Sequence, residues 1–284
     1  MPSRLLLAPA RAEAKRQHPG LDARLIRATS ADARAPGLWA QLAPELGLDA
    51  EGAGAAAVTL AADPAIELRA LAESRFVCLT PTWARAEVNG ARLLALAESL
   101  GTSPTEQQAI DQAVAEVAHD FGLIPTNHAS LWQLPATAAS GAGLAPPDHA
   151  LGTDLREALT LSGWWLKLFT EFQVALHVLP ANAVRVARGL PPVNTVWLHG
   201  AGGLPEVRRH WASVHSSDPL LLGLARLSGM ARAPITKAAL IDTRREGLAD
   251  ALPGFRGTLR CVSGEAWTLS RLDAFRIWRR PARR

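Results

Sequence analysis

The strongest structural signal in the chain is the stretch from residue 162 to residue 192, which has the apolar spacing of an amphipathic helix. Apolar side chains recur there at intervals of three and four residues, at Trp165, Leu168, Phe169, Phe172, Leu176 and Leu179. Pro180 interrupts this pattern, because proline has no N–H group and its ring clashes with the preceding turn. We therefore expect a long helix that is kinked or broken at Pro180.

Helix and strand patterns alternate along the rest of the chain. Helices are predicted at 36–48, 80–101, 103–122, 218–230, 245–252 and 271–280. Strands are predicted at 4–10 and 237–242 and as short segments within 58–71 and 73–81, and a hairpin is predicted at 257–270. This interleaving favours an α/β fold in which a mixed sheet is flanked by helices.

Two of the predicted helices have clear starts. Ser103 is a natural N-cap, Pro104 occupies the first helical position, and Glu106 completes a capping box. Asp218 is placed to cap the helix at 218–230.

A stretch rich in Pro, Gly and Ala at 135–152 is the best candidate for a domain boundary. It divides the chain into an N-terminal α/β part, 1–145, and a C-terminal α/β part, 146–284, which carries the 176–205 motif described below. A single continuous domain is the alternative, since 284 residues suffice for one large domain or two smaller ones.

Composition excludes several classes of protein. Hydrophobic residues make up 48% of the chain, which supports a full core rather than disorder. The net charge is +4 and the arginines are spread along the sequence, which argues against a nucleic-acid-binding domain. The only basic cluster is the tail Trp278–Arg284, which is either a solvated end or a contact to phosphates or an acidic partner.

The cysteines and apolar segments bear on the compartment. Cys78 and Cys261 form no CxxC pattern and no disulfide framework, which favours a reducing compartment. No signal-peptide pattern is found, and no apolar run reaches the ~18 residues that suggest a membrane span. We expect a cytoplasmic bacterial protein without membrane association.

Common nucleotide-binding and hydrolase motifs are missing from the sequence. The glycine turn expected at 200–205 lacks the last glycine of GxGxxG, and neither GxxxxGK[ST] nor GxSxG occurs. Glycines in a turn let backbone N–H groups approach an anion, but a plain tight turn can have the same composition.

One group of polar residues survives this elimination. His177, Asn182, Arg185 and Arg188 precede Asn194, Trp197, His199 and the glycines Gly200, Gly202 and Gly203. Guanidinium and amide groups beside a glycine turn are what a small anionic ligand needs. The alternative is that the arginines lie on the surface and that Asn182 caps the helix after Pro180.

The segment 176–205 resembles the RpfE-type regulatory protein family, whose bacterial members are described as similar to cofactor-independent phosphoglycerate mutases. The matching residues are His177, Pro180, Asn182, Arg185, Arg188, Gly189, Asn194, Trp197, Gly200, Gly202 and Gly203. Looser matches at 61–71 and 277–281 extend the similarity over most of the chain.

The resemblance implies a degenerate fold of the alkaline-phosphatase and phosphoglycerate-mutase type. In those enzymes two metals are held by Asp and His groups, and a Ser or Thr takes the phosphoryl group. This chain has no Asp-Gly after the strand at 4–10 and no Asp-x-x-x-His or Asp-His-Gly set near its end, and Thr195 and His199 replace Ser and Trp. Because phosphoryl transfer of this class needs paired cations, an active mutase is not expected.

We therefore expect a non-catalytic, mutase-like regulatory protein that binds a small phosphorylated metabolite and uses no cofactor or metal. The alternative is a divergent metal-dependent phosphotransferase or phosphoglycerate mutase, with ligands such as Asp148, His149, His210, His215 and Asp218. A third hypothesis is an interaction protein that engages a protein partner through its basic tail and spare tryptophans.

Overall fold

The computed structural model describes residues 4–49, 52–87, 90–96, 99–139, 146–152, 154–155, 161–208, 210–245, 247–270 and 273, with Asp148 and His149 described by backbone alone.

The chain forms two units. Unit 1 comprises Met1–Ala50 and Glu206–Arg284, and unit 2 comprises Glu51–Pro205. The units meet in sequence at 50/51 and 205/206. The predicted boundary at 145/146 falls within the range of unit 2, where the N–H of Gly152 donates to the carbonyl of Leu93.

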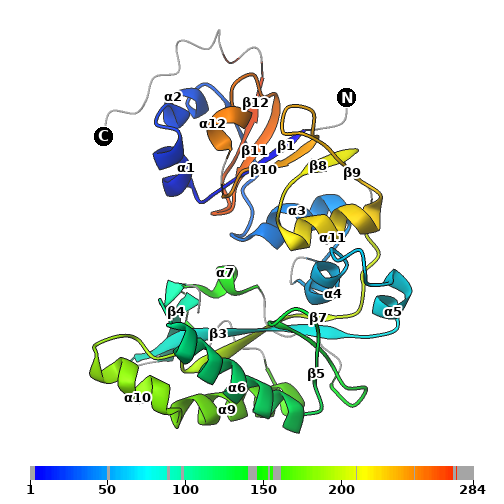
Figure 1. Cartoon of the computed structure of the whole chain (residues 1–284). Coiled ribbons are helices and arrows are strands. Elements are labelled where there is room, and N and C mark those ends of the chain that lie inside the picture. The colour runs from blue at the N-terminus through cyan, green and yellow to red at the C-terminus, as the bar shows by residue number, and fades with distance from the viewer. Residues whose placement is uncertain are drawn as a thin grey trace. The chain divides into compact units, whose positions relative to one another are not determined.

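Unit 1 contains a seven-stranded mixed sheet (Figure 1). The parallel strands β11, β1, β10, β8 and β9 form most of it, and β12 and β2 pair antiparallel at one edge. In spatial order the strands are β2 (Thr29–Ala31), β12 (Ala266–Leu269), β11 (Gly257–Cys261), β1 (Leu5–Ala8), β10 (Leu240–Asp242), β8 (Ser213–His215) and β9 (Ala231–Arg232). All four residues of β1 are apolar and buried, as expected for a central strand covered on both faces.

The helices of unit 1 bury the faces of this sheet. Helices α1 (Arg11–Gln17), α2 (Leu21–Leu25) and α12 (Leu248–Ala251) share an apolar core with Leu6 and Ala8 of the central strand. Helix α3 (Leu38–Leu46) confirms the helix predicted at 36–48, and α11 (Pro219–Ser228) begins after the predicted cap, Asp218. The strand predicted at 4–10 and the hairpin predicted at 257–270 are also present.

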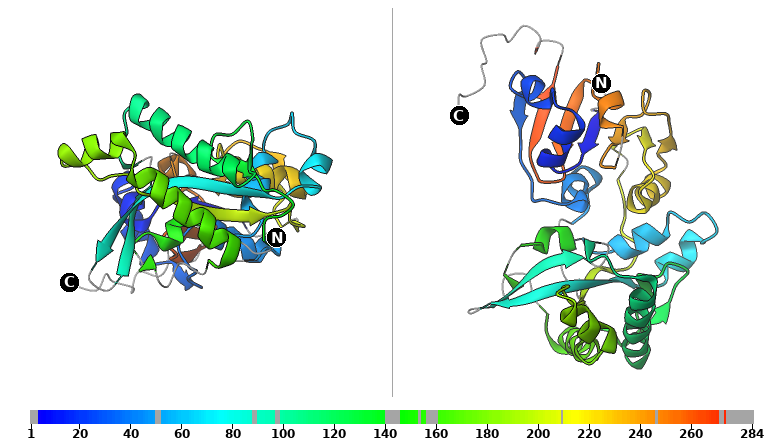
Figure 2. Two further views of the ribbon diagram at one scale, coloured as in Figure 1. Left: turned by 90° about the horizontal axis from the view of Figure 1, so that it is seen from below. Right: turned by 60° about the vertical axis from the view of Figure 1, so that its left-hand side comes forward.

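Unit 2 contains an antiparallel sheet centred on β3 (Phe76–Glu87). Strand β3 pairs with β4 (Gly90–Leu96), β6 (Leu131–Gln133) and β7 (Thr195–Gly202), and β6 pairs with β5 (Ile124–Pro125). Helices α6 (Pro104–Asp120) and α9 (Gly163–His177) cross one face of the sheet, as Figure 2 shows from below. Helices α4 (Ala55–Leu60) and α7 (Pro147–Ala150) lie on the opposite face (Figure 1), and α5 (Leu68–Ala72) precedes β3.

The two strongest helix predictions in unit 2 are confirmed. Helix α6 has the expected capping box, in which the Ser103 N–H donates to Glu106 Oε2 at 2.7 Å and the Glu106 N–H donates to Ser103 Oγ at 3.3 Å. Helix α9 ends at His177, and Pro180 is the first residue of a separate helix, α10 (Pro180–Ala187). The proline breaks the long helix and begins the next one, where its missing N–H has no cost.

Three predictions are wrong. The segment 80–101, predicted as a helix, supplies most of β3 and all of β4, and a register shift between Trp83 and Ala84 interrupts the two-residue alternation that marks a strand. The segment 58–71, predicted as short strands, contains the end of α4 and most of α5 and no strand, because the alanines that precede Val58 start a helix there. The first half of the glycine turn predicted at 200–205, up to Gly202, is the end of strand β7.

Two further predictions concern the chain as a whole. The helix predicted at 271–280 and the tail Trp278–Arg284 lie outside the described residues, apart from Asp273. Within the described part of the chain, no helix combines the length and the apolar character that crossing a membrane requires.

Candidate functional site

Asn182, one of the predicted ligand-binding residues, is buried and fastens α10 to the strand that follows it. Its side-chain amide donates to the carbonyls of Leu176, at 2.7 Å, and Val193, at 2.6 Å. Its carbonyl oxygen accepts the N–H of Val193 at 2.8 Å. The amide thus fixes the end of α9 and the start of β7 at one point, and these three bonds all go to protein backbone.

Arg185 is completely buried and ties α10 to the start of α6. Its guanidinium donates to the carbonyls of Pro191, at 2.9 Å, and Leu100, at 2.7 Å, and lies 3.1 Å from Glu106 Oε2. The exposed Arg188 reaches the same carboxylate, with Nη1 3.8 Å from Oε1. Hydrogen bonds from Ser103, and then the charge of Arg185, hold the pKa of Glu106 below its usual value.

Asn194 and Trp197 both lie near Ala84, where β7 pairs with β3. The Asn194 side chain accepts from the N–H of Ala84 at 2.9 Å and donates to its carbonyl at 2.8 Å, so it bridges the register shift in β3. Trp197 is fully buried in an apolar cluster with Ala84, Leu93, Ala150 and Leu155.

The glycines of the motif allow the backbone of β7 to approach α4 closely. Gly200 has φ +66°, and a Cβ there would lie 2.9 Å from the backbone N of Ala56. Gly202 has φ +145°, and a Cβ there would lie 2.9 Å from the backbone N of Gly54. A Cβ added at Gly203 would have more room, because the nearest atom to it would be the carbonyl oxygen of Ser74, at 3.4 Å.

The two histidines of the motif lie apart from these groups. His177 is exposed at the end of α9, while His199 on β7 is half-buried and hydrogen-bonded to Thr80 Oγ1 at 3.0 Å. Burial raises the pKa of the nearby Cys78 thiol, but the charge of His199 and hydrogen bonds from His199 and Thr80 outweigh it and leave the pKa below 9.0. The ten predicted residues thus fall into separate groups, and their role in ligand binding stays a prediction.

A second polar arrangement lies in unit 1, at the carboxyl ends of β8 and β10. Ligands of open α/β sheets are usually bound at this edge. Asp218 Oδ1 accepts the N–H groups of Leu220, at 2.9 Å, and Leu221, at 3.3 Å, and so caps α11. Ser216 joins the two strands, because its hydroxyl donates to Asp242 Oδ2 at 2.8 Å and accepts the N–H of Asp218 at 2.9 Å.

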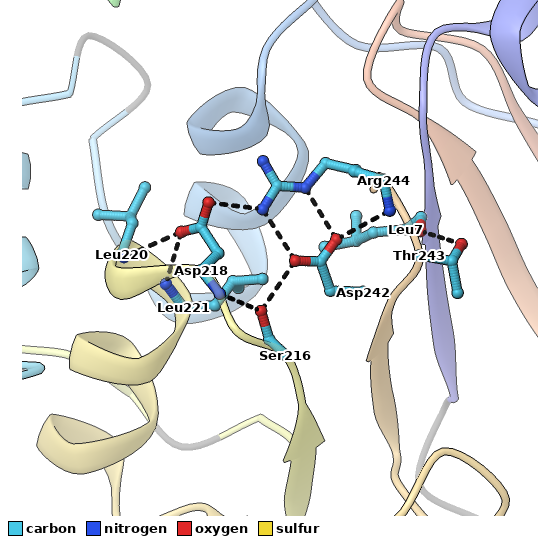
Figure 3. A network of polar contacts seen from close by, with 8 residues as sticks. All are labelled: Leu7, Ser216, Asp218, Leu220, Leu221, Asp242, Thr243 and Arg244. Carbon is cyan, nitrogen blue, oxygen red and sulfur yellow. Dashed lines mark hydrogen bonds and ion pairs between the residues drawn. The ribbon is translucent and has the colours of Figure 1, made fainter. Parts of the chain in front are cut away.

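Arg244 lies between the two carboxylates of this arrangement (Figure 3). Its Nε and Nη2 reach the two oxygens of Asp242, at 2.9 Å each, and Nη2 also lies 2.8 Å from Asp218 Oδ2. Burial raises the pKa of Asp242, but the hydrogen bonds and charge of Arg244 outweigh this, and the pKa lies below its usual value. Burial lowers the pKa of Arg244, yet the two carboxylates raise it overall, so the guanidinium stays charged.

A cavity of about 450 Å³ opens beside this network. It is lined by His215, Ser216, Ser217, Asp218, Ile235, Asp242, Arg245, Gly247 and Asp250. His215 Nδ1 lies 3.1 Å from the carbonyl oxygen of Ala233, so an Nδ1–H bond there leaves Nε2 available to a ligand. The cavity therefore offers cationic, imidazole and carboxylate groups to a polar molecule of metabolite size.

The sequence indicated some of the residues at the carboxyl ends of β8 and β10 but not the network around Arg244. It named His215 and Asp218 as alternative metal ligands but did not name Ser216, Asp242 or Arg244. The available signal was the position of Asp242, which ends an apolar strand and lies two positions before an arginine. That signal is weak without the parallel pairing of β8, β10 and β1, which brings distant segments to one edge.

The predicted metal ligands do not form one cluster among the residues that the structure describes. His215 and Asp218 line the same cavity, whereas the ring of His210 packs against Trp211 with 4.7 Å between ring centroids. The side chains of Asp148 and His149 are outside the description. Among the described side chains, no group of three or more His, Cys, Asp or Glu is close enough to hold a metal ion.

No family model matches the sequence, and no curated protein matches it. A cofactor-independent phosphoglycerate mutase from Thermoplasma acidophilum is similar in structure, with a TM-score of 0.35 and 12% identity over 94% of this chain and 89% of that one. The PH0037 protein from Pyrococcus horikoshii is similar with a TM-score of 0.39 and 12% identity, over 94% of this chain and 86% of that one.

Proposed function

We propose that this chain is a non-catalytic, phosphoglycerate-mutase-like regulatory protein that binds a small phosphorylated ligand at the carboxyl edge of the unit 1 sheet. The observation that supports this best is the position of Arg244 between Asp218 and Asp242. The two free cysteines, Cys78 and Cys261, suit a reducing compartment, and we place the protein in the bacterial cytoplasm.

Arg244 accounts for the absence of turnover in this proposal. Paired cations in phosphoryl transfer neutralise the phosphoryl oxygens and activate the nucleophile. A guanidinium also offsets carboxylate charge, but it stays protonated and cannot lower the pKa of a bound water or hydroxyl as a metal does. Arg244 engages three of the four oxygens of Asp218 and Asp242 and so occupies the oxygens that a metal would need.

The ligand class follows from the other groups that line the cavity. Arg245 supplies guanidinium donors suited to a phosphoryl group, and Asp250 and the Nε2 of His215 are acceptors suited to ligand hydroxyls. The arrangement fits a phosphorylated hydroxy acid better than a ligand that is anionic at every position.

A thermal-shift measurement on the full chain tests the proposal, with 3-phosphoglycerate as the probe and glycerate as the unphosphorylated control. We expect 3-phosphoglycerate to raise the Tm of the wild type and to raise it much less in Arg245→Ala. Arg16→Ala is the matched control, because Arg16 is an exposed arginine of unit 1 that pairs only with Glu13 among the contacts described. An unchanged Tm in the wild type at millimolar 3-phosphoglycerate contradicts the proposal.

The second candidate is the divergent metal-dependent phosphotransferase. It is favoured by His215, which offers Nε2 to the same cavity as Asp218. Elemental analysis of the purified protein and isothermal titration with Mn²⁺ distinguish the two. Tight Mn²⁺ binding by the wild type, lost in His215→Ala, supports the enzyme; binding that appears only after Arg244→Ala supports the non-catalytic protein.

A further inference from the structure

A second cavity lies in unit 1 near the amino ends of the parallel strands, opposite to the carboxyl ends where the first cavity opens. Its volume is about 420 Å³, and arginines line it from two segments: Arg24 and Arg27 at α2, and Arg256 just before β11. Because β11 runs parallel to β1 and β10, the start of β11 marks the amino edge of the sheet, whereas the site of the proposed function lies at the carboxyl edge.

The arginines are positioned by the backbone that follows α12. Arg24 Nη2 donates to the carbonyl of Phe255 at 3.1 Å, and Nη1 donates to that of Leu252. Arg256 Nη1 donates to the same Phe255 carbonyl at 2.8 Å. One carbonyl oxygen therefore holds the guanidiniums of Arg24 and Arg256 beside each other, at the entrance of β11.

Among the described residues that line this cavity, positive side chains outnumber negative ones. Three guanidiniums line it and Asp273 is the one carboxylate among its described lining residues. Asp273 is itself engaged by Ser270, whose N–H and hydroxyl donate to its two oxygens at 2.7 Å and 2.9 Å. Burial and then the like charge of Arg256 lower the pKa of Arg24, and Asp273 only partly opposes this. Neighbouring like charges are unfavourable, and an anion placed among them relieves the repulsion.

We propose that this cavity binds the phosphate group of a small phosphorylated ligand between Arg24, Arg27 and Arg256. Guanidinium groups present paired N–H donors that match phosphate oxygens, and converging arginines are the usual protein partner of a phosphate monoester. A volume of about 420 Å³ admits a small metabolite as well as inorganic phosphate. This site is independent of the carboxyl-edge cavity and is assigned by its own contacts.

Isothermal titration of the full chain with inorganic phosphate at constant ionic strength tests the assignment. We expect Arg27→Ala and Arg256→Ala each to weaken phosphate binding about tenfold, as for the loss of one charge-assisted hydrogen bond. Arg256→Glu should abolish binding, and Arg256→Lys should retain part of it. Arg16→Ala is the control for a general loss of positive charge, and circular dichroism verifies that each variant is folded.

The outcomes separate this site from the proposed function. Phosphate binding that survives Arg245→Ala and is lost in Arg256→Glu supports the arginine cavity. Binding that is lost only in Arg245→Ala overturns this inference and leaves the carboxyl-edge proposal intact. No phosphate binding by the wild type, or binding equally weakened by Arg16→Ala, also overturns it, and the 3-phosphoglycerate measurement then decides the proposed function separately.

Discussion

Arg185 and Glu106 form an ion pair at 3.1 Å, although 79 positions separate them in the sequence. The pair joins the second turn of α10 to the capping box at the start of α6, inside unit 2. Because the arginine is fully buried and also donates to two carbonyls, its contacts are those of a structural residue.

Replacing Arg185 should destabilise unit 2. Arg185→Ala leaves the carbonyls of Leu100 and Pro191 without their donor and Glu106 without its buried partner. We expect the Tm to fall by about 5 °C or more. Arg188→Ala is the matched control, since Arg188 is exposed and only approaches the same carboxylate. Equal stability of the two variants, measured by thermal melting, would refute the structural role.

Replacing Asn182 should also destabilise unit 2, because its side chain is hydrogen-bonded to buried backbone groups. Asn182→Ala removes three hydrogen bonds to buried backbone groups, which should cost about 2–4 kcal/mol of unfolding free energy. His177→Ala, at the exposed end of α9, should change it by less than about 0.5 kcal/mol. Urea denaturation monitored by tryptophan fluorescence measures both, and an Asn182→Ala variant as stable as His177→Ala contradicts the account.

The glycines of β7 can be tested by comparing two positions of similar φ. Gly200 has φ +66° and meets the backbone of α4, whereas Gly189 has φ +73° and open space around it. Gly189→Ala should cost only the conformational term of about 1–2 kcal/mol. Gly200→Ala should cost distinctly more, because its Cβ must displace α4. If denaturant titrations show the same loss of unfolding free energy for both variants, the close approach of α4 is not the reason for glycine at position 200.

The Asp242–Arg244 pair predicts a dependence of stability on pH. The folded-state pKa of Asp242 lies below its usual value, so its contribution to stability is present above about pH 4 and is lost as the pH falls through the folded pKa. Arg244→Gln should remove much of this contribution. Thermal melting from pH 7 to pH 3 should show a steeper loss for the wild type than for the variant. Parallel curves would contradict the coupling.

The two cysteines should differ in reactivity. The pKa of Cys78 lies below 9.0 because His199 and Thr80 outweigh its burial, whereas burial and the charge of Glu265 raise the pKa of Cys261 to about 12. Alkylation with iodoacetamide at pH 8 should therefore modify Cys78 first, and His199→Ala should slow that reaction. Peptide mass spectrometry measures each site, and faster labelling of Cys261 would be the opposite result.

The sequence predicted the elements whose signals are local. The capping box at Ser103, the break at Pro180 and the cap at Asp218 depend on neighbouring residues, and all three are present. The first half of strand β3 was predicted, within 73–81, but its second half was taken for a helix, because its identity comes from pairing with other strands and the register shift at Trp83 hides its alternation. The Asn89-Gly90 dipeptide, typical of hairpin turns, was the local signal that could have revealed it.

The site was predictable only in part, for a related reason. The ligand-binding role of the polar residues at 177–203 stays a prediction, and three of them, Asn182, Arg185 and Asn194, donate hydrogen bonds to backbone carbonyls. The residues at the carboxyl edge of unit 1 come from segments that only the parallel sheet brings together. Spacing along the chain carries no information about such an edge.

The close approach of Gly54 to the end of β7 brings the two ends of unit 2 together. The N–H of Gly54 donates to the carbonyl of Ala201 at 3.1 Å, so unit 2 begins and finishes at almost the same point. A module whose two ends coincide can be spliced into a surface loop of a host without stretching it. Unit 1, interrupted after Ala50 and resumed at Glu206, has the organisation of such a host.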